Sequence, residues 1–204
     1  AGIPISPAET VYFTTARTPR PSPLPQASVP DPPPSPASAE VHQFLQESQA
    51  RLSSSDHAIS YLTKRGISLS IAQAAGIGFA PRRSWPNTRG AGQPRIVAPL
   101  TTPDGTLLTL YGRSTVRCEK SLRHDFLPGA KGVFHASSLA HDHVVLIEGV
   151  FDTLACLAGG LQATGLCGVS IRDAWWRAIT ATHMTIAMDA DEAGQAAQHR
   201  LEDL

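Results

Sequence analysis

The sequence predicts an α/β protein in which a small, basic α+β subdomain precedes a parallel sheet flanked by helices. From residue 144 onward, strand-like apolar runs alternate with helical stretches, which is typical of such a sheet. Upstream, short helical segments precede two strand-like runs joined by Pro103-Asp104-Gly105, a hairpin-type turn. The 204 residues are 42% hydrophobic and 17% charged, so most of the chain can bury a core.

Proline dominates the beginning of the chain. Residues 1–36 hold 11 of the 17 prolines, including Pro32-Pro33-Pro34. Proline fixes the backbone and lacks an amide proton, so this stretch favours neither a helix nor a central strand. We expect residues 1–37 to be a disordered or extended linker without catalytic residues.

Residues 38–140 are expected to form the basic subdomain. Apolar residues at helical spacing predict its helices, and serines or an aspartate at their starts supply caps. The predicted elements are helices over 39–53, from Ser55 or Asp56 to Arg65, and from Ser68 to Gly76, with strands over 95–101 and 106–113.

Residues 141–204 are expected to form the second domain, and its sheet is predicted to be incomplete at the C-terminal end. Its predicted elements are strands over 144–147, 161–164 and 185–188 and helices over 151–159, 172–180 and 192–203. In parallel sheets, functional groups gather beyond the carboxyl ends of the strands. Glu148 and Asp189 both fall at that edge.

The charges are divided unevenly although their sum is zero. Residues 57–135 carry 11 Lys and Arg against 3 Asp and Glu, whereas residues 136–204 carry 3 against 9. This asymmetry suggests a polyanion held beside metal-binding carboxylates. The alternative is two solvated faces of opposite sign.

Three carboxylates at strand ends are the candidate catalytic residues. An acid that ends a buried run is rare unless it is capped, paired or bound to a cation, and Glu148 is such an acid. Asp189 and Asp191 are two residues apart, so in extended backbone they face the same side. A divalent cation such as Mg²⁺ or Mn²⁺ would offset their repulsion. Asp152 and Glu192 each begin a helix, where a negative charge is favourable without any further role.

These residues resemble a known domain. Glu148-Gly149 and the segment DADEAG at 189–194 are similar to the TOPRIM domain of topoisomerases, bacterial primases and some nucleases, and EGVFDTLACLAGGLQATGLCG at 148–168 resembles its primase branch. Upstream, residues 58–79, 95–113 and 124–134 resemble the helical opening, hairpin and lysine-bearing loop of DnaG-type primases, in the same order.

The resemblance implies a TOPRIM-type, Rossmann-like sheet and a DNA primase, a DNA-directed RNA polymerase that makes short RNA primers by metal-assisted phosphoryl transfer. It implies catalysis and Mg²⁺ or Mn²⁺ ligation by Glu148, Asp189 and Asp191. It further implies nucleic-acid or nucleotide contacts by Arg95, Arg113 and Lys131. The expected partners are a single-stranded DNA template, nucleoside triphosphates and a replicative helicase.

Two alternatives remain open at this point. One is a non-catalytic, Mg²⁺-binding module that docks nucleic acid or a primosome, and the other is another TOPRIM phosphotransferase, a nuclease or a topoisomerase. The absent zinc-ligand spacing and the early end of the TOPRIM region suggest a fragment of a longer primase or a plasmid or mobile-element relative.

Composition limits the cellular setting. No run approaches 18 apolar residues, so we expect no membrane span. The 3 cysteines form no CxxC pair, which favours a reducing cytoplasm.

Overall fold

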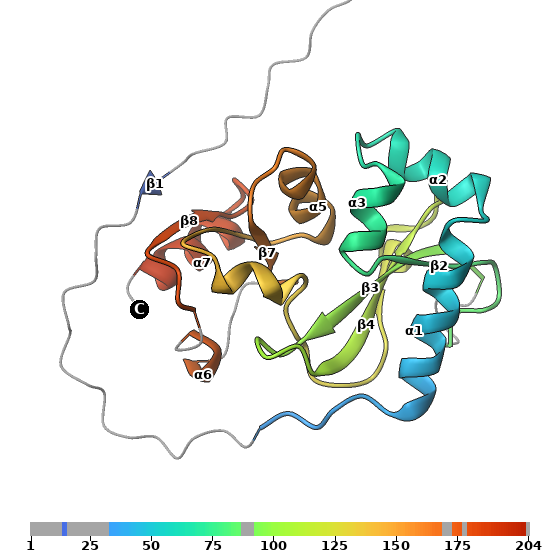
Figure 1. Ribbon diagram of the computed structural model, residues 1–204. Coiled ribbons are helices and arrows are strands. Elements are labelled where there is room, and N and C mark those ends of the chain that lie inside the picture. Colours follow the sequence, from blue (N-terminus) through green and yellow to red (C-terminus); the bar gives the residue numbers. More distant parts are fainter. Residues whose placement is uncertain (1–13, 16–32, 87–91, 169–172, 177–178, 203–204) are drawn as a thin grey trace, which may run out of the picture.

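Two four-stranded sheets lie side by side in the computed structural model, which describes residues 14–15, 33–86, 92–168, 173–176 and 179–202 (Figure 1). One sheet is antiparallel and carries helices α1 to α3, and the other is mainly parallel and carries helices α5 to α7. The predicted α/β fold class is therefore confirmed. None of the helices in the described ranges combines the length and hydropathy that a membrane crossing requires.

The antiparallel sheet has the strand order β2-β3-β4-β5. Its strands are β2 (Gly78–Ala80), β3 (Arg95–Thr101), β4 (Leu107–Ser114) and β5 (His124–Phe126). Strands β3 and β4 form the predicted hairpin. At its turn the backbone amide of Thr106 donates to the Asp104 carboxylate over 3.1 Å, and Gly105 takes a φ of 91°, which glycine adopts without steric cost.

Three helices cover this sheet, namely α1 (Ala39–Leu52), α2 (Asp56–Thr63) and α3 (Leu69–Ala74). The Ser55 side chain accepts from the amide of Ala58, so Ser55 rather than Asp56 caps α2. The Ser68 side chain caps α3 in the same way, by accepting from the amide of Ile71.

The second sheet has the order β1-β8-β6-β7. Its strands are β1 (Thr14–Thr15), β6 (His143–Ile147), β7 (Ala163–Gly165) and β8 (His183–Ala187). Strand β6 pairs in parallel with both β7 and β8, and β1 pairs antiparallel with β8. The helices are α5 (Val150–Ala158), α6 (Asp173–Trp176) and α7 (Glu192–Glu202).

Several short elements were not predicted. Besides β2 and β5 they are helix α4 (Lys120–Arg123) and the 3₁₀ helix η1 (Ala136–Ala140). Strand β1 falls inside the predicted linker, and most of that linker lies outside the described residues. Residues 172 and 177–178 of the predicted helix over 172–180 also lie outside them.

Residues Val133 and Phe134 join the two sheets. Val133 exchanges two backbone hydrogen bonds with Thr101 at the end of β3, and Phe134 exchanges two with Gly165 of β7. Phe134 is buried in one apolar cluster that also includes residues of α2, α3, β3 and α5. The two sheets thus share a core, and the predicted domain boundary at 140/141 stays a prediction.

Gly78 offers a test of how α1 is seated on the antiparallel sheet. A Cβ atom at residue 78 would lie 2.7 Å from the carbonyl carbon of Ser48 in α1, so α1 could not keep its position. We expect Gly78→Ala to cost about 1–3 kcal/mol in the free energy of unfolding. Urea denaturation measures this, with Gly92→Ala as the control because a Cβ there meets nothing within 4 Å. Equal stability of the two variants would contradict the close packing.

Candidate active site

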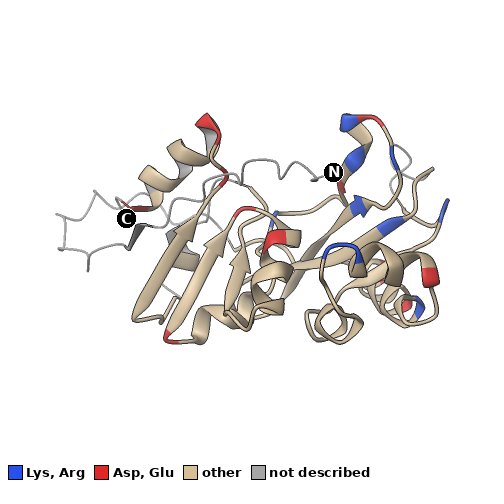
Figure 2. Ribbon diagram, turned by 90° about the horizontal axis from the view of Figure 1, so that it is seen from above, with Lys and Arg blue, Asp and Glu red and all other residues tan. Residues whose placement is uncertain are grey.

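Glu148 and Asp189 lie at the same edge of the parallel sheet. Strands β6 and β8 pair in register, with Ile147 opposite Ala187, so the residues that follow them emerge side by side. Figure 2 shows acidic residues gathered at the carboxyl ends of these strands and basic residues concentrated on the antiparallel half. We call Glu148, Asp152, Asp189 and Asp191 the acidic edge.

The Glu148 carboxylate is the centre of this edge. It is half-buried and accepts a hydrogen bond from the backbone amide of Asp189. Burial raises the pKa of Glu148, and the charges of Asp189, Asp191 and then Asp152 raise it further. The structure therefore brings together the three predicted acids and adds Asp152, whose position in the first turn of α5 could also be explained by the helix dipole alone.

Gly194 fixes the turn that carries the two aspartates. Its backbone amide donates to the Asp191 carboxylate over 2.8 Å. A Cβ atom at residue 194 would lie 2.9 Å from the carbonyl carbon of Asp189, so only glycine allows α7 to begin this close to the strand end. The side chains of Asp189 and Asp191 remain exposed at this turn.

The chemistry of the acidic edge fits a hard divalent cation, since its side-chain donors are carboxylate oxygens. Within the described residues, no group of three or more His, Cys, Asp or Glu side chains is arranged to hold a metal ion. Mg²⁺ does not require such a cage, because it usually keeps several waters and binds through one or two carboxylates. Metal ligation by these acids stays a prediction.

An arginine-lined cavity of 250 Å³ opens in the basic half. We call it the arginine pocket, and its lining residues are Tyr61, Arg65, Arg113, Ser114, Thr115, Val116, Arg117, Cys118 and Arg123. Four guanidinium groups around so small a space give it a positive charge that would attract a polyanion. Of the four arginines, only Arg113 was predicted to bind nucleic acid. The sequence gives little signal for the others, because Arg65 is distant along the chain and Arg117 and Arg123 lie outside the predicted helices and strands.

Aromatic contacts connect the arginine pocket to the acidic edge. The Arg65 guanidinium lies 3.9 Å from the centroid of the Tyr61 ring and 5.4 Å from that of Phe151. The rings of Tyr61 and Phe151 meet edge to face at 5.9 Å. Phe151 belongs to the first turn of α5, three residues after Glu148, so these contacts run from the pocket to the helix that follows the acidic edge.

Lys131 also lies close to the acidic edge. It is exposed, and a Cβ atom on Gly168 would lie 3.8 Å from its Nζ. Burial raises the pKa of the neighbouring Cys167 thiol to about 12, and the Lys131 charge opposes that rise. The Cys167 amide donates to the carbonyl of Glu148 over 2.9 Å, which places the loop beneath Lys131 directly against the catalytic candidate.

Arg95 requires a correction. Sequence reasoning predicted a nucleic-acid contact, yet its side chain is 0% exposed. Its guanidinium donates to the carbonyl oxygens of Gly112 at 3.0 Å and Leu122 at 2.9 Å. Burial lowers the pKa of Arg95, and the charge of Asp125 partly restores it. Arg95 therefore tethers α4 to the antiparallel sheet and does not face a ligand.

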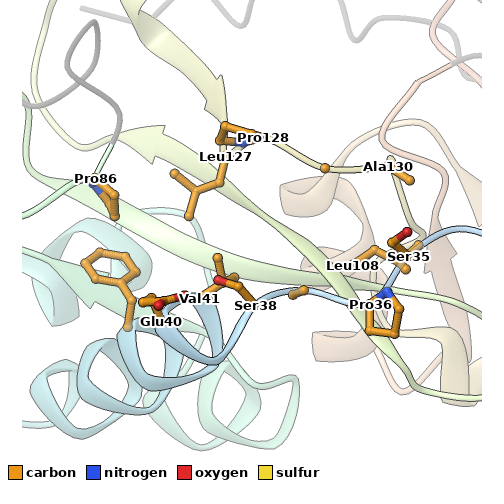
Figure 3. Close-up of a pocket in the computed structure, with 13 residues that line it drawn as sticks. Ser35, Pro36, Ser38, Glu40, Val41, Pro86, Leu108, Leu127, Pro128 and Ala130 are labelled. Atoms are coloured by element: carbon orange, nitrogen blue, oxygen red, sulfur yellow. The ribbon is translucent and has the colours of Figure 1, made fainter.

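A larger cavity, of 810 Å³, lies elsewhere, between α1, residues 35–37 and residues 127–130 (Figure 3). Its labelled walls include Val41, Leu108 and Leu127, and Glu40 is the one charged residue among the described residues that line it. It lacks the cations that phosphate binding needs, so we place the candidate site at the acidic edge and the arginine pocket.

The raised pKa of Glu148 predicts that its charge destabilises the folded protein. Above its ordinary pKa the unfolded carboxyl ionises freely, whereas the folded one ionises against its neighbours. Glu148→Gln should therefore raise the Tm by roughly 1–3 °C at pH 7 in EDTA, and by less at pH 4, where the carboxyl is largely protonated in both states. Glu119→Gln, at an exposed site, is the control. An equal change at both pH values would contradict the repulsion.

Comparison with known proteins places the fold. Residues 145–204 match the family model described as Toprim-like, and no curated protein matches the chain by sequence. The zinc-binding and RNA polymerase domains of the Aquifex aeolicus primase are 19% identical, with a TM-score of 0.61 over 78% of this chain and 49% of that one.

Two further primase structures agree with this match. The E. coli primase catalytic core is 18% identical, with a TM-score of 0.59 over 79% of this chain and 64% of that one. The RNA polymerase domain of Mycobacterium tuberculosis DnaG is 18% identical, with a TM-score of 0.57 over 80% of this chain and 71% of that one. The chain spans 49% of the Aquifex structure and 64% of the E. coli core. In fold, the chain thus resembles the catalytic core of bacterial DnaG-type primases and carries a TOPRIM-type domain, as its sequence motifs imply.

Proposed function

We propose that the chain carries out primase-type nucleotidyl transfer, joining nucleoside triphosphates into a short RNA primer on single-stranded DNA. The observation that carries the proposal is the series of contacts, through Tyr61 and Phe151, from the arginine pocket to the helix that begins directly after Glu148. Phosphoryl transfer needs cations that hold phosphates next to carboxylates that hold a metal.

The acidic edge would supply the metal ligands. Asp189 and Asp191 are exposed and lie at one turn, and the raised pKa of Glu148 shows that its charge is opposed by its neighbours, so a cation beside it would favour its ionised form. A bound divalent cation would lower the pKa of the attacking hydroxyl and neutralise charge on the phosphate oxygens. The protein's own part is to hold these carboxylates at one edge despite their repulsion.

The arginine pocket and Lys131 would hold the phosphates. A guanidinium group grips a phosphate through two parallel hydrogen bonds, which fixes its orientation as well as its position. Arg65, Arg117 and Arg123 are exposed, and Arg113 is half-buried at the end of β4. The Lys131 Nζ lies 5.0 Å from the centroid of the Phe126 ring and close to Gly168 after β7, so it would add a second positive charge beside the acidic edge.

Single-stranded DNA is the proposed template. One similar structure is a DnaG primase catalytic domain bound to single-stranded DNA, and another is the Mycobacterium tuberculosis domain in complex with double-stranded DNA. These matches are 18% and 21% identical to the chain, and they support a nucleic-acid partner. Nucleoside triphosphates and a replicative helicase are proposed from the primase resemblance alone.

The reading as a topoisomerase receives less support. That chemistry uses a tyrosine hydroxyl as a nucleophile. Burial raises the pKa of Tyr111 to about 12, and the Tyr61 hydroxyl donates to the carbonyl of Ser114 over 3.4 Å. Of the tyrosines in the described part of the chain, neither presents its hydroxyl to the acidic edge as a nucleophile.

Primer synthesis from labelled nucleoside triphosphates on single-stranded DNA tests the proposed activity. Asp189→Asn should reduce product at least ~100-fold, because it removes a charge from the metal site. Asp142→Asn, at the amino end of β6 on the opposite edge of the same sheet, should leave synthesis unchanged. Product that persists in Asp189→Asn would contradict the assigned role.

The non-catalytic alternative is distinguished by the same assay. It is favoured by the lack of a preformed three-ligand metal group among the described residues. If it holds, the wild-type chain binds single-stranded DNA yet gives no template-dependent product at any Mg²⁺ or Mn²⁺ concentration.

The arginine pocket predicts a salt-dependent affinity. Each phosphate contact with single-stranded DNA contributes about 0.7 to the slope of log K against log salt. The double substitution Arg65→Gln and Arg117→Gln should therefore reduce that slope by about 1.4, if each arginine meets one phosphate. Fluorescence anisotropy with a labelled oligonucleotide measures the slope. Arg82→Gln, at an exposed turn outside the pocket, is the control, and an equal slope in all variants would locate the DNA elsewhere.

A further inference from the structure

We propose that His124 is a positioning residue whose imidazole accepts a hydrogen bond from Arg113 and so holds that guanidinium in place to bind phosphate. The inference rests on the proposed function, since it needs Arg113 to be a phosphate ligand. His124 lies at the start of β5, where it is exposed beside Arg113 and Arg123, two residues that line the arginine pocket.

The contact follows from the strand register. Strands β4 and β5 are antiparallel, with Arg113 directly opposite His124. The Arg113 Nη1 makes its closer contact with the His124 Nε2 and lies 3.4 Å from Nδ1, and Nδ1 lies 2.8 Å from the hydroxyl oxygen of Tyr111. The imidazole is thus held at both nitrogens by two residues of the same strand.

Only one arrangement of protons satisfies the two shorter contacts, Arg113 with Nε2 and Tyr111 with Nδ1. A guanidinium can only donate, so Nε2 must accept and must carry no proton. The imidazole proton then lies on Nδ1 and is donated to the Tyr111 hydroxyl oxygen. His124 therefore acts as a neutral acceptor toward Arg113.

The surroundings keep the imidazole neutral. The charged and titratable groups that face it are Arg113 and Tyr111 from β4, Arg123 from α4 and Arg95 from β3. Burial and these three cations lower the pKa of His124 to about 4. The phenol of Tyr111 is neutral too, because burial raises its pKa to about 12 and it keeps its proton.

A neutral acceptor suits a phosphate ligand better than a carboxylate would. A carboxylate would orient Arg113 but also neutralise it, leaving less attraction for an anion. An imidazole restricts the long side chain and leaves its full charge and its remaining N–H groups for the phosphate. Preorganisation of this kind improves affinity without a new contact to the ligand.

The experiment measures binding of inorganic tripolyphosphate to the full chain by isothermal titration calorimetry at pH 7. His124→Phe keeps a planar ring but loses the acceptor, and should weaken binding roughly 3- to 10-fold. His124→Gln restores an acceptor oxygen and should bind within about 2-fold of wild type. His143→Phe, at the opposite edge of the second sheet, is the control and should bind as wild type. Thermal unfolding checks that all variants are folded.

The outcomes separate the two proposals. If Arg113→Ala binds as wild type, the phosphate role of Arg113 fails and the role of His124 fails with it. If Arg113→Ala weakens binding and His124→Phe does not, only the positioning role is overturned. A Gln variant as weak as the Phe variant likewise overturns the acceptor role.

Nitrogen-15 NMR tests the proton arrangement independently of any ligand. We expect an unprotonated Nε2 and a protonated Nδ1 for His124, persisting as the pH is lowered to near 4. Arg113→Ala should move the Nε2 resonance. A charged imidazole at pH 6, or a proton on Nε2, would overturn the proposal.

Discussion

The repulsion among Glu148, Asp189 and Asp191 is the constraint on which the candidate site depends. Parallel pairing of β6 with β8 forces the strand ends together, and the amide of Asp189 donates to the Glu148 carboxylate. The backbone of Gly194 packs closely against that of Asp189, and its amide donates to the Asp191 carboxylate, which fixes the turn that carries the second aspartate. The backbone therefore sustains a concentration of charge that the side chains alone would disperse, which is the state in which a cation is bound most favourably.

A second constraint is the orientation of cations toward those carboxylates. The antiparallel sheet keeps one arginine, Arg95, entirely inside and presents another, Arg113, to the arginine pocket. Arg65 is kept over Tyr61 and Phe151 by stacking. Arginine thus has a structural role at residue 95, where it binds backbone carbonyls, and lines the pocket at residue 113. Only the position in the sheet distinguishes the two roles.

Much of this arrangement follows from the sequence, and its failures have physical causes. The run RIVAPLT predicted β3 at its observed bounds, and the strand-ending acids were predicted to meet. Strands β2 and β5 have three residues each, too few to show a period. Burial of Arg95 could not be foreseen, because two of the groups that its guanidinium binds are backbone carbonyls, which have no signature in side-chain patterns. The arginine pocket is likewise assembled by tertiary packing of α2, β4 and α4.

The pairing of Val133 and Phe134 with both sheets determines how the molecule can move. Rotation of one half against the other would break the four backbone hydrogen bonds that these two residues make with Thr101 and Gly165. Phe134 is also enclosed in the shared apolar cluster, so such rotation would expose its ring to water. Residues Val133 and Phe134 therefore hold the two sheets in a fixed relative orientation and do not act as a hinge. A ligand that contacted both sheets would therefore meet the arginine pocket and the acidic edge in one fixed arrangement, without any rotation of the sheets on binding.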